Sequence, residues 1–225
     1  MSAVVIGASG GIGAALADAL EEEGTPVRRL ARSFGGRDRL DFDDEGSIAD
    51  AATSLGSPTL VVVATGLLHE DGQRPERSMA ELDPAWLARQ YHVNVVGPAL
   101  VAKHVLPRMP RTGRTVFAML SARIGSITDN RLGGWYGYRA AKAALNQLVR
   151  TLAIEQTRVN GRSIVVGLHP GTVDTALSRP FQANVPADQL FAPGRAAVQL
   201  LDVIDGLKAP DTGKLFDWQG HEIAP

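Results

Sequence analysis

Short apolar runs alternate with longer amphipathic segments along the whole chain, and this alternation is what most limits its possible folds. The apolar runs that we expect to be strands are Ala3–Ile6, Pro26–Ala31, Leu40–Phe42, Leu60–Ala64, Thr115–Leu120, Ser163–His169 and Lys214–Asp217. The segments that we expect to be helices are Ile12–Glu23, Ser47–Ser54, Pro84–Leu106, Trp135–Thr157 and Pro193–Gly206. Strands that are apolar on both faces suit a sheet that helices cover on both sides. The pattern predicts an α/β fold, a doubly wound parallel sheet of about seven strands with helices on both faces.

Composition excludes several classes of function. The chain has 225 residues, of which 44% are hydrophobic, so one domain over residues 1–225 has enough material for a core. The net charge of −1 comes without blocks of like charge, which argues against nucleic-acid and membrane partners. Without cysteine there is no disulfide or thiolate metal site, and we expect no metal. The first apolar run is too short for a signal peptide, so we expect a cytoplasmic protein.

A glycine-rich turn, Gly7–Gly13, directly follows the first expected strand and precedes the first expected helix. Glycines let a chain turn tightly and let a ligand approach the backbone. The free N–H groups and the positive dipole end of a helix start suit a pyrophosphate. Turns of this composition also simply join strands to helices, and the spacing Gly-x3-Gly-x-Gly is not the commoner GxGxxG. In this position the turn favours dinucleotide binding.

Tyr138 and Lys142 lie four residues apart in an expected helix, so both side chains lie on one helical face. An ammonium beside a phenol favours the phenolate and lowers the pKa of the tyrosine. Such a tyrosine can exchange a proton with a carbonyl or alcohol oxygen. The alternative is a solvated pair on a helix surface.

Four motifs in this order resemble those of the short-chain dehydrogenase/reductase family, and the resemblance covers nearly the whole chain. They are Gly7, Gly11 and Gly13 of the turn, Asn94, the Tyr138–Lys142 pair, and the segment from Pro170 through Gly171, Val173 and Thr175. The segment 121–126, the run 133–135 and the ending 213–218 resemble the C-factor-like and carbonyl-reductase-like bacterial subgroup. The resemblance implies a single NAD(P)-binding Rossmann domain.

The resemblance also implies residue roles for hydride transfer between a nicotinamide and a carbonyl carbon. Tyr138 is the expected proton donor, and Lys142 lowers its pKa and holds the nicotinamide ribose. Asn94 is expected to position a water between Lys142 and solvent; the alternative is an asparagine that bonds a neighbouring backbone carbonyl.

The serine that assists the tyrosine in this family is harder to place. Alignment through Gly125 puts Ala122 in its position, whereas counting from the strand start leaves Ser121 closest to it. We expect Ser121 to act, with Ser126 as the alternative because the segment before Tyr138 is longer than usual. Loss of such a donor costs roughly 10²–10³ in turnover.

The cofactor is expected to be NADP(H) rather than NAD(H). Arg32 and Ser33 end the second expected strand without a carboxylate, and a guanidinium suits a 2′-phosphate. The alternative is that Arg32, like Arg28, Arg29 and Arg37 nearby, is a solvated charge. The residues expected to contact the cofactor are Gly7, Ser9, Gly11, Ile12, Gly13, Arg32, Ser33, Asp41, Phe42, Ala64, Thr65, Gly66, Tyr138, Lys142, Pro170, Gly171, Val173 and Thr175.

Some of these assignments come from the resemblance alone. Asp41 is expected to meet the adenine amino group, Val173 the carboxamide and Thr175 the pyrophosphate. Residues 64–66 read Ala-Thr-Gly where the family commonly has an Asn-Asn-Ala-Gly element, which leaves Gly66 to line the cofactor.

The expected function is the NADPH-dependent reduction of a small or medium ketone or aldehyde. The alternative is a catalytically weak dinucleotide-binding signalling or sensor protein, which the Ser-Ala segment and Ala141 favour. A lid is expected over Leu177–Val185, with Arg179 or Arg123 near any anionic group of the substrate. We expect His169 to pack and His69 to lie on the surface. A homodimer is possible in this family, and a monomer is not excluded.

Overall fold

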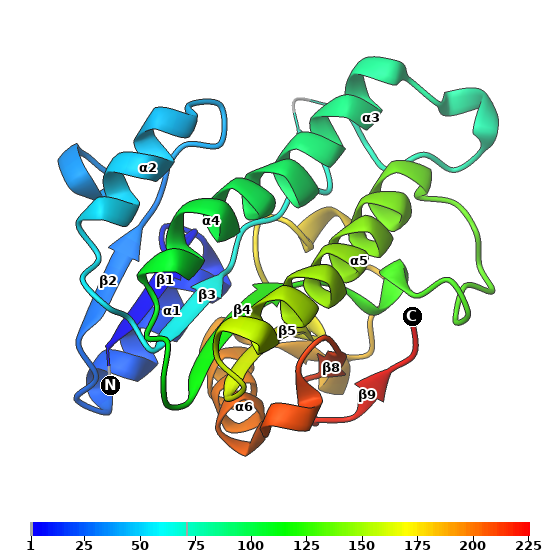
Figure 1. The fold of residues 1–225 in the computed structure, drawn as a ribbon. Coiled ribbons are helices and arrows are strands. Elements are labelled where there is room, and N and C mark those ends of the chain that lie inside the picture. The colour runs from blue at the N-terminus through cyan, green and yellow to red at the C-terminus, as the bar shows by residue number, and fades with distance from the viewer. Residues whose placement is uncertain (1, 71) are drawn as a thin grey trace.

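The computed structural model describes residues 2–70 and 72–225. Its central sheet has seven strands in the order β2-β1-β3-β4-β5-β8-β9 (Figure 1). The strands are β1 Ala3–Ile6, β2 Val27–Leu30, β3 Leu60–Val63, β4 Thr115–Leu120, β5 Ser163–His169, β8 Leu215–Asp217 and β9 Glu222–Ile223. The pairs are parallel except β8–β9, which is antiparallel. A separate pair joins β6 Thr172–Val173 to β7 Leu190–Phe191.

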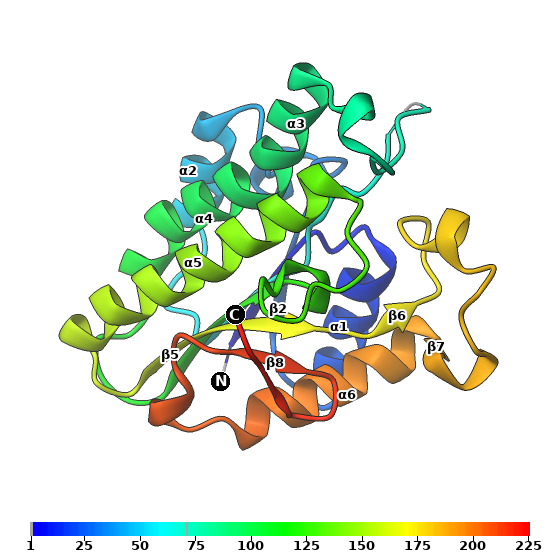
Figure 2. The ribbon, with the colours of Figure 1, turned by 90° about the vertical axis from the view of Figure 1, so that its right-hand side faces the viewer.

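Helices cover both faces of this sheet (Figures 1 and 2). The helices are α1 Gly11–Glu22, α2 Glu45–Thr53, α3 Pro84–Tyr91, α4 Gly97–Val105, α5 Tyr136–Val159 and α6 Pro193–Gly206. One core lies between the sheet and α1 with α6, and the other lies between the sheet and α2, α4 and α5. Alternate residues of the strands enter each core, as Val62 and Val61 of β3 do. The predicted fold class is confirmed.

The predicted strand Leu40–Phe42 is wrong. Residues 40–42 form no strand; the isolated bridge nearby joins Arg39, just before them, to Ala31, and the seventh strand of the sheet is β9 instead. The polar residues that follow explain the difference. The Ser47 hydroxyl and backbone close a turn around Asp41 and Asp44, and Asp44 caps α2. The chain therefore turns into the helix where the sequence pattern indicated a strand.

The predicted helix Pro84–Leu106 is interrupted by a π-helical turn, His92–Val96, between α3 and α4. Pro98 has no N–H to donate to the carbonyl of Asn94 four residues earlier, so the α-helical ladder is broken there. The N–H of Gly97 instead reaches His92, five residues back. This turn holds one of the predicted site residues, as π-turns inside helices often do.

The strand order reverses at β1, whose neighbours are β2 on one side and β3 on the other. In open α/β sheets a ligand binds beyond the carboxyl ends of the strands at such a switch point. The glycine turn after β1 and the segment after β3 both lie there. Among the described residues, no helix is long and apolar enough to span a membrane.

Candidate active site

The glycine turn is a cradle that larger residues cannot form. Gly7 has a left-handed backbone with φ of 86°. A Cβ on Gly13 would lie 2.2 Å from the carbonyl oxygen of Gly7, and one on Gly11 would lie 2.8 Å from Cγ2 of Thr175. The N-cap of α1 is Gly10, whose position offers no side-chain hydrogen bond. The first N–H groups of α1 are therefore available to an anion.

A cavity of about 280 Å³ extends from this turn along the carboxyl ends of β1, β2 and β3. It is lined by eight of the predicted cofactor contacts: Gly7, Ser9, Arg32, Asp41, Phe42, Ala64, Thr65 and Gly66. The hydroxyl of Thr65 is buried here without a hydrogen-bond partner among the described residues. A buried unsatisfied hydroxyl is costly, and a polar group of a bound ligand would satisfy it. The cavity therefore fits the adenosine half of a dinucleotide.

Of the arginines around the second strand, Arg32 lines the cavity. Arg28 pairs with Asp38 at 2.8 Å, and Arg29 pairs with Asp18 and Glu21 of α1 at 2.6 and 2.7 Å. Ser33 is exposed next to Arg32. Among the arginines around the second strand, the one in the cavity wall is thus the one that the sequence singled out.

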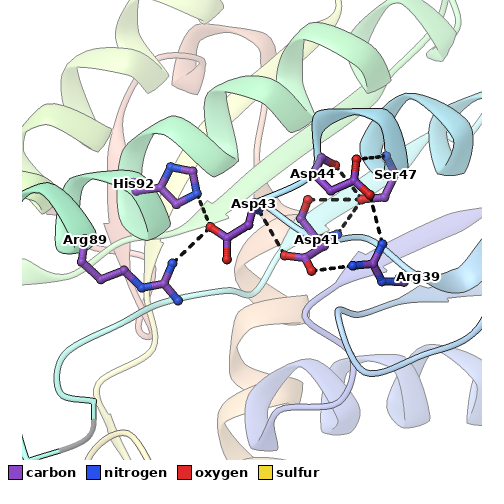
Figure 3. Close-up of polar contacts among 7 residues, drawn as sticks. All are labelled: Arg39, Asp41, Asp43, Asp44, Ser47, Arg89 and His92. Carbon is purple, nitrogen blue, oxygen red and sulfur yellow. Dashed lines mark hydrogen bonds and ion pairs between the residues drawn. The ribbon is translucent and has the colours of Figure 1, made fainter.

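Asp41 is held in place in the wall of the cavity (Figure 3). One carboxylate oxygen lies 2.7 Å from Nη2 of Arg39, and the other accepts the N–H of Asp43 at 3.1 Å. Phe42 packs against α4, where a Cβ on Gly97 would lie 2.1 Å from its ring. The polar and aromatic walls are therefore fixed by contacts outside the cavity.

Tyr138 and Lys142 occupy the first turns of α5 and are both buried, with 7% and 2% of their surfaces exposed. Nζ of Lys142 lies 5.6 Å from the centre of the Tyr138 ring and donates to the carbonyl of Leu120 at 2.9 Å. Burial of the two side chains removes them from water, which raises the pKa of the Tyr138 hydroxyl and lowers the pKa of the Lys142 ammonium to about 8. The expected lowering of the tyrosine pKa is thus corrected: desolvation outweighs the nearby ammonium.

Asn94 is fully buried in the π-turn and braces the segment after β3. Its Nδ2 donates to the carbonyls of Leu67 and Gln90 at 2.8 and 3.0 Å, and its Oδ1 accepts the N–H of Leu67 at 3.0 Å. Both amide hydrogens are therefore used, which leaves one acceptor site on Oδ1. A Cβ on Gly66 would lie 3.7 Å from that oxygen and 3.9 Å from Nζ of Lys142. Gly66 thus joins the cofactor cavity to the buried lysine.

Each of the two candidate serines has hydrogen-bond partners other than Tyr138. Ser121 is buried and donates to Oδ1 of Asn146, one turn along α5 from Lys142, at 2.6 Å. Ser126 accepts the N–H of Asp129 at 3.2 Å and lines a groove of about 930 Å³ behind α5. Neither Tyr138 nor Lys142 lines that groove. Among the described residues, no hydrogen bond joins either serine to Tyr138, so the role of Ser121 stays a prediction.

A buried carboxylate that the sequence did not reveal holds the start of α5. Glu76 is 1% exposed, accepts the N–H of Gly137 at 3.1 Å and contacts Nε2 of Gln90 at 3.4 Å. Its carbonyl accepts the N–H of Trp135 at 2.5 Å. A carboxylate at a helix N-terminus is stabilised by the helix dipole. A Cβ on Gly137 would lie 2.9 Å from this carboxylate, so the glycine before Tyr138 was the available signal.

An aromatic row connects the expected lid to Tyr138. The ring centres of Tyr138 and Trp135 are 6.4 Å apart, those of Trp135 and Phe181 5.1 Å, and those of Phe181 and His69 5.7 Å. The rings meet edge to face, which is a favoured geometry. His69 is half-buried and its Nε2 lies 3.1 Å from the carbonyl of Ala176. His69 therefore lies at the surface but is partly covered by Phe181 of the expected lid.

The segment after β5 lies at the carboxyl end of the parallel strands, the end at which the cavity also lies (Figure 2). Gly171 is left-handed, and a Cβ there would lie 2.7 Å from the ring of Phe191. The carbonyl of Val173 accepts the hydroxyl of Ser178, and the Thr175 methyl packs on Gly11. Arg123 is bound by Asp217 and Asp129 at 3.1 and 3.3 Å, so its charge is already compensated.

Burial also lowers the pKa of His169, at the end of β5, to about 4. The histidine is therefore neutral at physiological pH.

Comparisons with known proteins show which family the chain is similar to. The family model described as enoyl-(acyl carrier protein) reductase matches residues 27–193. The C-signal protein of Myxococcus xanthus is 36% identical over 146 residues, which are 65% of this chain and 82% of that protein. The cis-4-hydroxycyclohexanecarboxylate dehydrogenase of Sinomonas cyclohexanicum is 32% identical over 205 residues, which are 83% of this chain and 77% of that protein.

Solved structures share the fold at lower identity. The NADPH-bound carbonyl reductase from chicken fatty liver has a TM-score of 0.83 at 22% identity, covering 100% of this chain and 98% of that one. The carbonyl reductase Sniffer of Drosophila melanogaster has a TM-score of 0.82 at 20% identity, covering 100% and 99%.

Proposed function

The chain belongs to the short-chain dehydrogenase/reductase family, of the carbonyl-reductase-like type, and from this we propose that it is an NADP(H)-dependent reductase of ketones or aldehydes. The observation that carries the proposal is the buried Tyr138–Lys142 pair beside Gly66, at the end of a cavity that fits the adenosine half of a dinucleotide. A protein that only binds a nucleotide gains nothing from a buried proton donor next to an ammonium.

In the proposed reaction, bound NADPH supplies the hydride that reduces the carbonyl carbon. Tyr138 gives its phenolic proton to the carbonyl oxygen, and the ammonium of Lys142 stabilises the phenolate that remains. Asn94 fixes the segment that carries Gly66, and its free acceptor site on Oδ1 suits a water that returns a proton to Lys142. We keep Ser121 as the proposed donor to the carbonyl oxygen, a role in which its hydroxyl leaves Asn146.

The proposed preference for NADP(H) rests on Arg32. Its guanidinium lines the cavity, while neighbouring Arg28 and Arg29 are bound to carboxylates elsewhere. Three structural neighbours are described as bound to NADP or NADPH. A guanidinium can donate two N–H groups to two oxygens of a phosphate at once, and an adenosine without a 2′-phosphate offers no such pair of oxygens.

The first test is Tyr138→Phe, because it removes one hydroxyl and keeps the ring that packs on Trp135. We expect NADPH affinity within about twofold of wild type and a loss of turnover of at least about 10³, since the proton donor is gone. NADPH fluorescence measures binding, and NADPH oxidation over a panel of ketones, aldehydes and quinones measures turnover. Turnover that survives the substitution would exclude Tyr138 as the acid.

A second candidate function is a dinucleotide-binding signalling or sensor protein. The 36% identity to the C-signal protein favours it, as does the absence of a serine at position 122. Tight NADPH binding without turnover over the whole panel would support this alternative. We further propose one cytoplasmic domain over residues 1–225 that acts on a small-molecule carbonyl, as a monomer or homodimer.

A further inference from the structure

Two charged residues outside the predicted site line the cofactor cavity together with Arg32. Glu70 follows β3, and Arg89 lies on α3. Nε and Nη2 of Arg89 donate to the two carboxylate oxygens of Glu70 at 3.0 and 3.3 Å, so the pair is bidentate. A bidentate pair holds both side chains in one geometry. The pair therefore forms a fixed part of the cavity wall.

A second carboxylate holds Arg89 from the other side (Figure 3). Nη1 of Arg89 lies 3.3 Å from Oδ1 of Asp43, and the same oxygen lies 2.8 Å from Nε2 of His92. The Arg89 side chain is only 28% exposed, compared with 57% for Asp43. Arg89 is thus clamped between two carboxylates that both line the cavity.

The cavity wall carries both acidic and basic side chains. Asp41, Asp43 and Glu70 are the acidic residues that line it, and Arg32 and Arg89 are the basic ones. Asp41 has its own cation in Arg39, outside the cavity. The pKa of Glu70 is lowered mainly by its hydrogen bond from Arg89, and Arg32 also lowers it through its charge. Glu70 therefore lies within electrostatic reach of the arginine proposed to take the 2′-phosphate.

We propose that Arg89 is a specificity-determining residue for the cofactor: it neutralises Glu70 and so permits a phosphate dianion beside Arg32. Without Arg89, the exposed carboxylate repels the 2′-phosphate of NADP(H). NAD(H) carries no charge at that position, so its affinity falls little. The inference rests on the proposed dinucleotide function and adds to it a second determinant, on α3, far in sequence from the second strand.

The test compares NADPH and NADH dissociation constants for four proteins: wild type, Arg89→Met, Glu70→Gln and the double variant. A unit charge roughly 7 Å from a dianion in a water-like dielectric changes affinity on the order of five- to tenfold. Arg89→Met is expected to lower the preference for NADPH over NADH by about this factor, and Glu70→Gln to preserve or raise it. The double variant is expected to regain most of the preference lost in Arg89→Met, because the repelling charge is gone.

Arg29→Met serves as the matched control. Arg29 is also bound bidentately by a glutamate, but on α1 and outside the cavity, so its removal is expected to leave the ratio unchanged. NADH affinity reports whether each variant keeps an intact site. If Arg89→Met weakens both cofactors equally, or if the double variant stays as low as the single one, the inference is overturned while the reductase proposal stands. A wild-type protein that binds neither dinucleotide overturns both.

Discussion

Replacement of Gly13 by alanine tests the geometry of the cofactor turn. The added Cβ would lie 2.2 Å from the carbonyl oxygen of Gly7, 2.8 Å from its carbonyl carbon and 3.2 Å from Cα of Ala8. All three neighbours are backbone atoms of the turn, so no side chain can rotate away. The contact is relieved only if α1 and the turn move apart.

The cost follows from this geometry. Overpacking costs about 1–3 kcal/mol where side chains can adapt, so a clash with backbone lies at the upper end, about 3 kcal/mol. Alanine in a helix recovers about 1 kcal/mol relative to glycine, which leaves a net loss of about 2 kcal/mol in the free energy of unfolding. For a chain of this size that corresponds to a fall in Tm of about 4–8 °C. NADPH affinity is expected to fall more than tenfold, because the turn that cradles the pyrophosphate has moved.

The assay is thermal unfolding by circular dichroism, with NADPH titration of the same samples. Gly10→Ala is the matched control, since its Cβ would lie 3.4 Å from the same carbonyl oxygen. We expect the control to keep its Tm within about 2 °C of wild type. Equal Tm and equal NADPH affinity in the two variants would refute the close approach of α1 to the turn.

Three further predictions concern the reaction and the binding of NADPH. The kcat/KM of carbonyl reduction is expected to fall as pH rises through about 8, because the pKa of Lys142 is lowered to about 8 and the ammonium is lost above it; a steady-state pH profile with no inflection below pH 10 would contradict this. Ser121→Ala is expected to lower kcat by roughly 10²–10³ and Ser126→Ala by less than about threefold, measured as NADPH oxidation, and equal effects would remove Ser121 from the mechanism. Gly97→Ala is expected to weaken NADPH binding by about tenfold, because the new methyl group would lie 2.1 Å from the Phe42 ring in the cavity wall; unchanged titration curves would show that Phe42 does not contribute.

The parts of the fold that the sequence predicted depend on local patterns. Runs such as Leu60–Val63, which are apolar on both faces, are strands of the central sheet in the structure. The failure at Leu40–Phe42 has a physical cause. A segment of three residues with Asp41 at its centre is too short to favour a strand over a turn, and Ser47 and Asp44 settle the turn through hydrogen bonds to backbone atoms. Such contacts depend on side-chain placement that periodicity does not report.

The site was predictable where two residue types at a fixed spacing carry the chemistry, as Tyr138 and Lys142 do. Glu76 was not predictable, because its partner Gly137 is 61 residues away and the contact exists only in three dimensions. The same holds for Arg89 and Glu70, 19 residues apart on separate elements. Ser121 shows a third case: its position in the chain was clear, but its hydrogen bond to Asn146 needed the structure.

The aromatic row gives the protein a fluorescent reporter of its own lid. The chain has three tryptophans, of which Trp86 is buried on α3 and Trp218 packs on Phe191 at 4.7 Å. Trp135 alone touches both the lid, through Phe181, and the proposed proton donor. If the segment Leu177–Val185 acts as the expected lid, a variant that keeps only this indole is expected to change its emission on lid opening, so that stopped flow could time the opening without any added label.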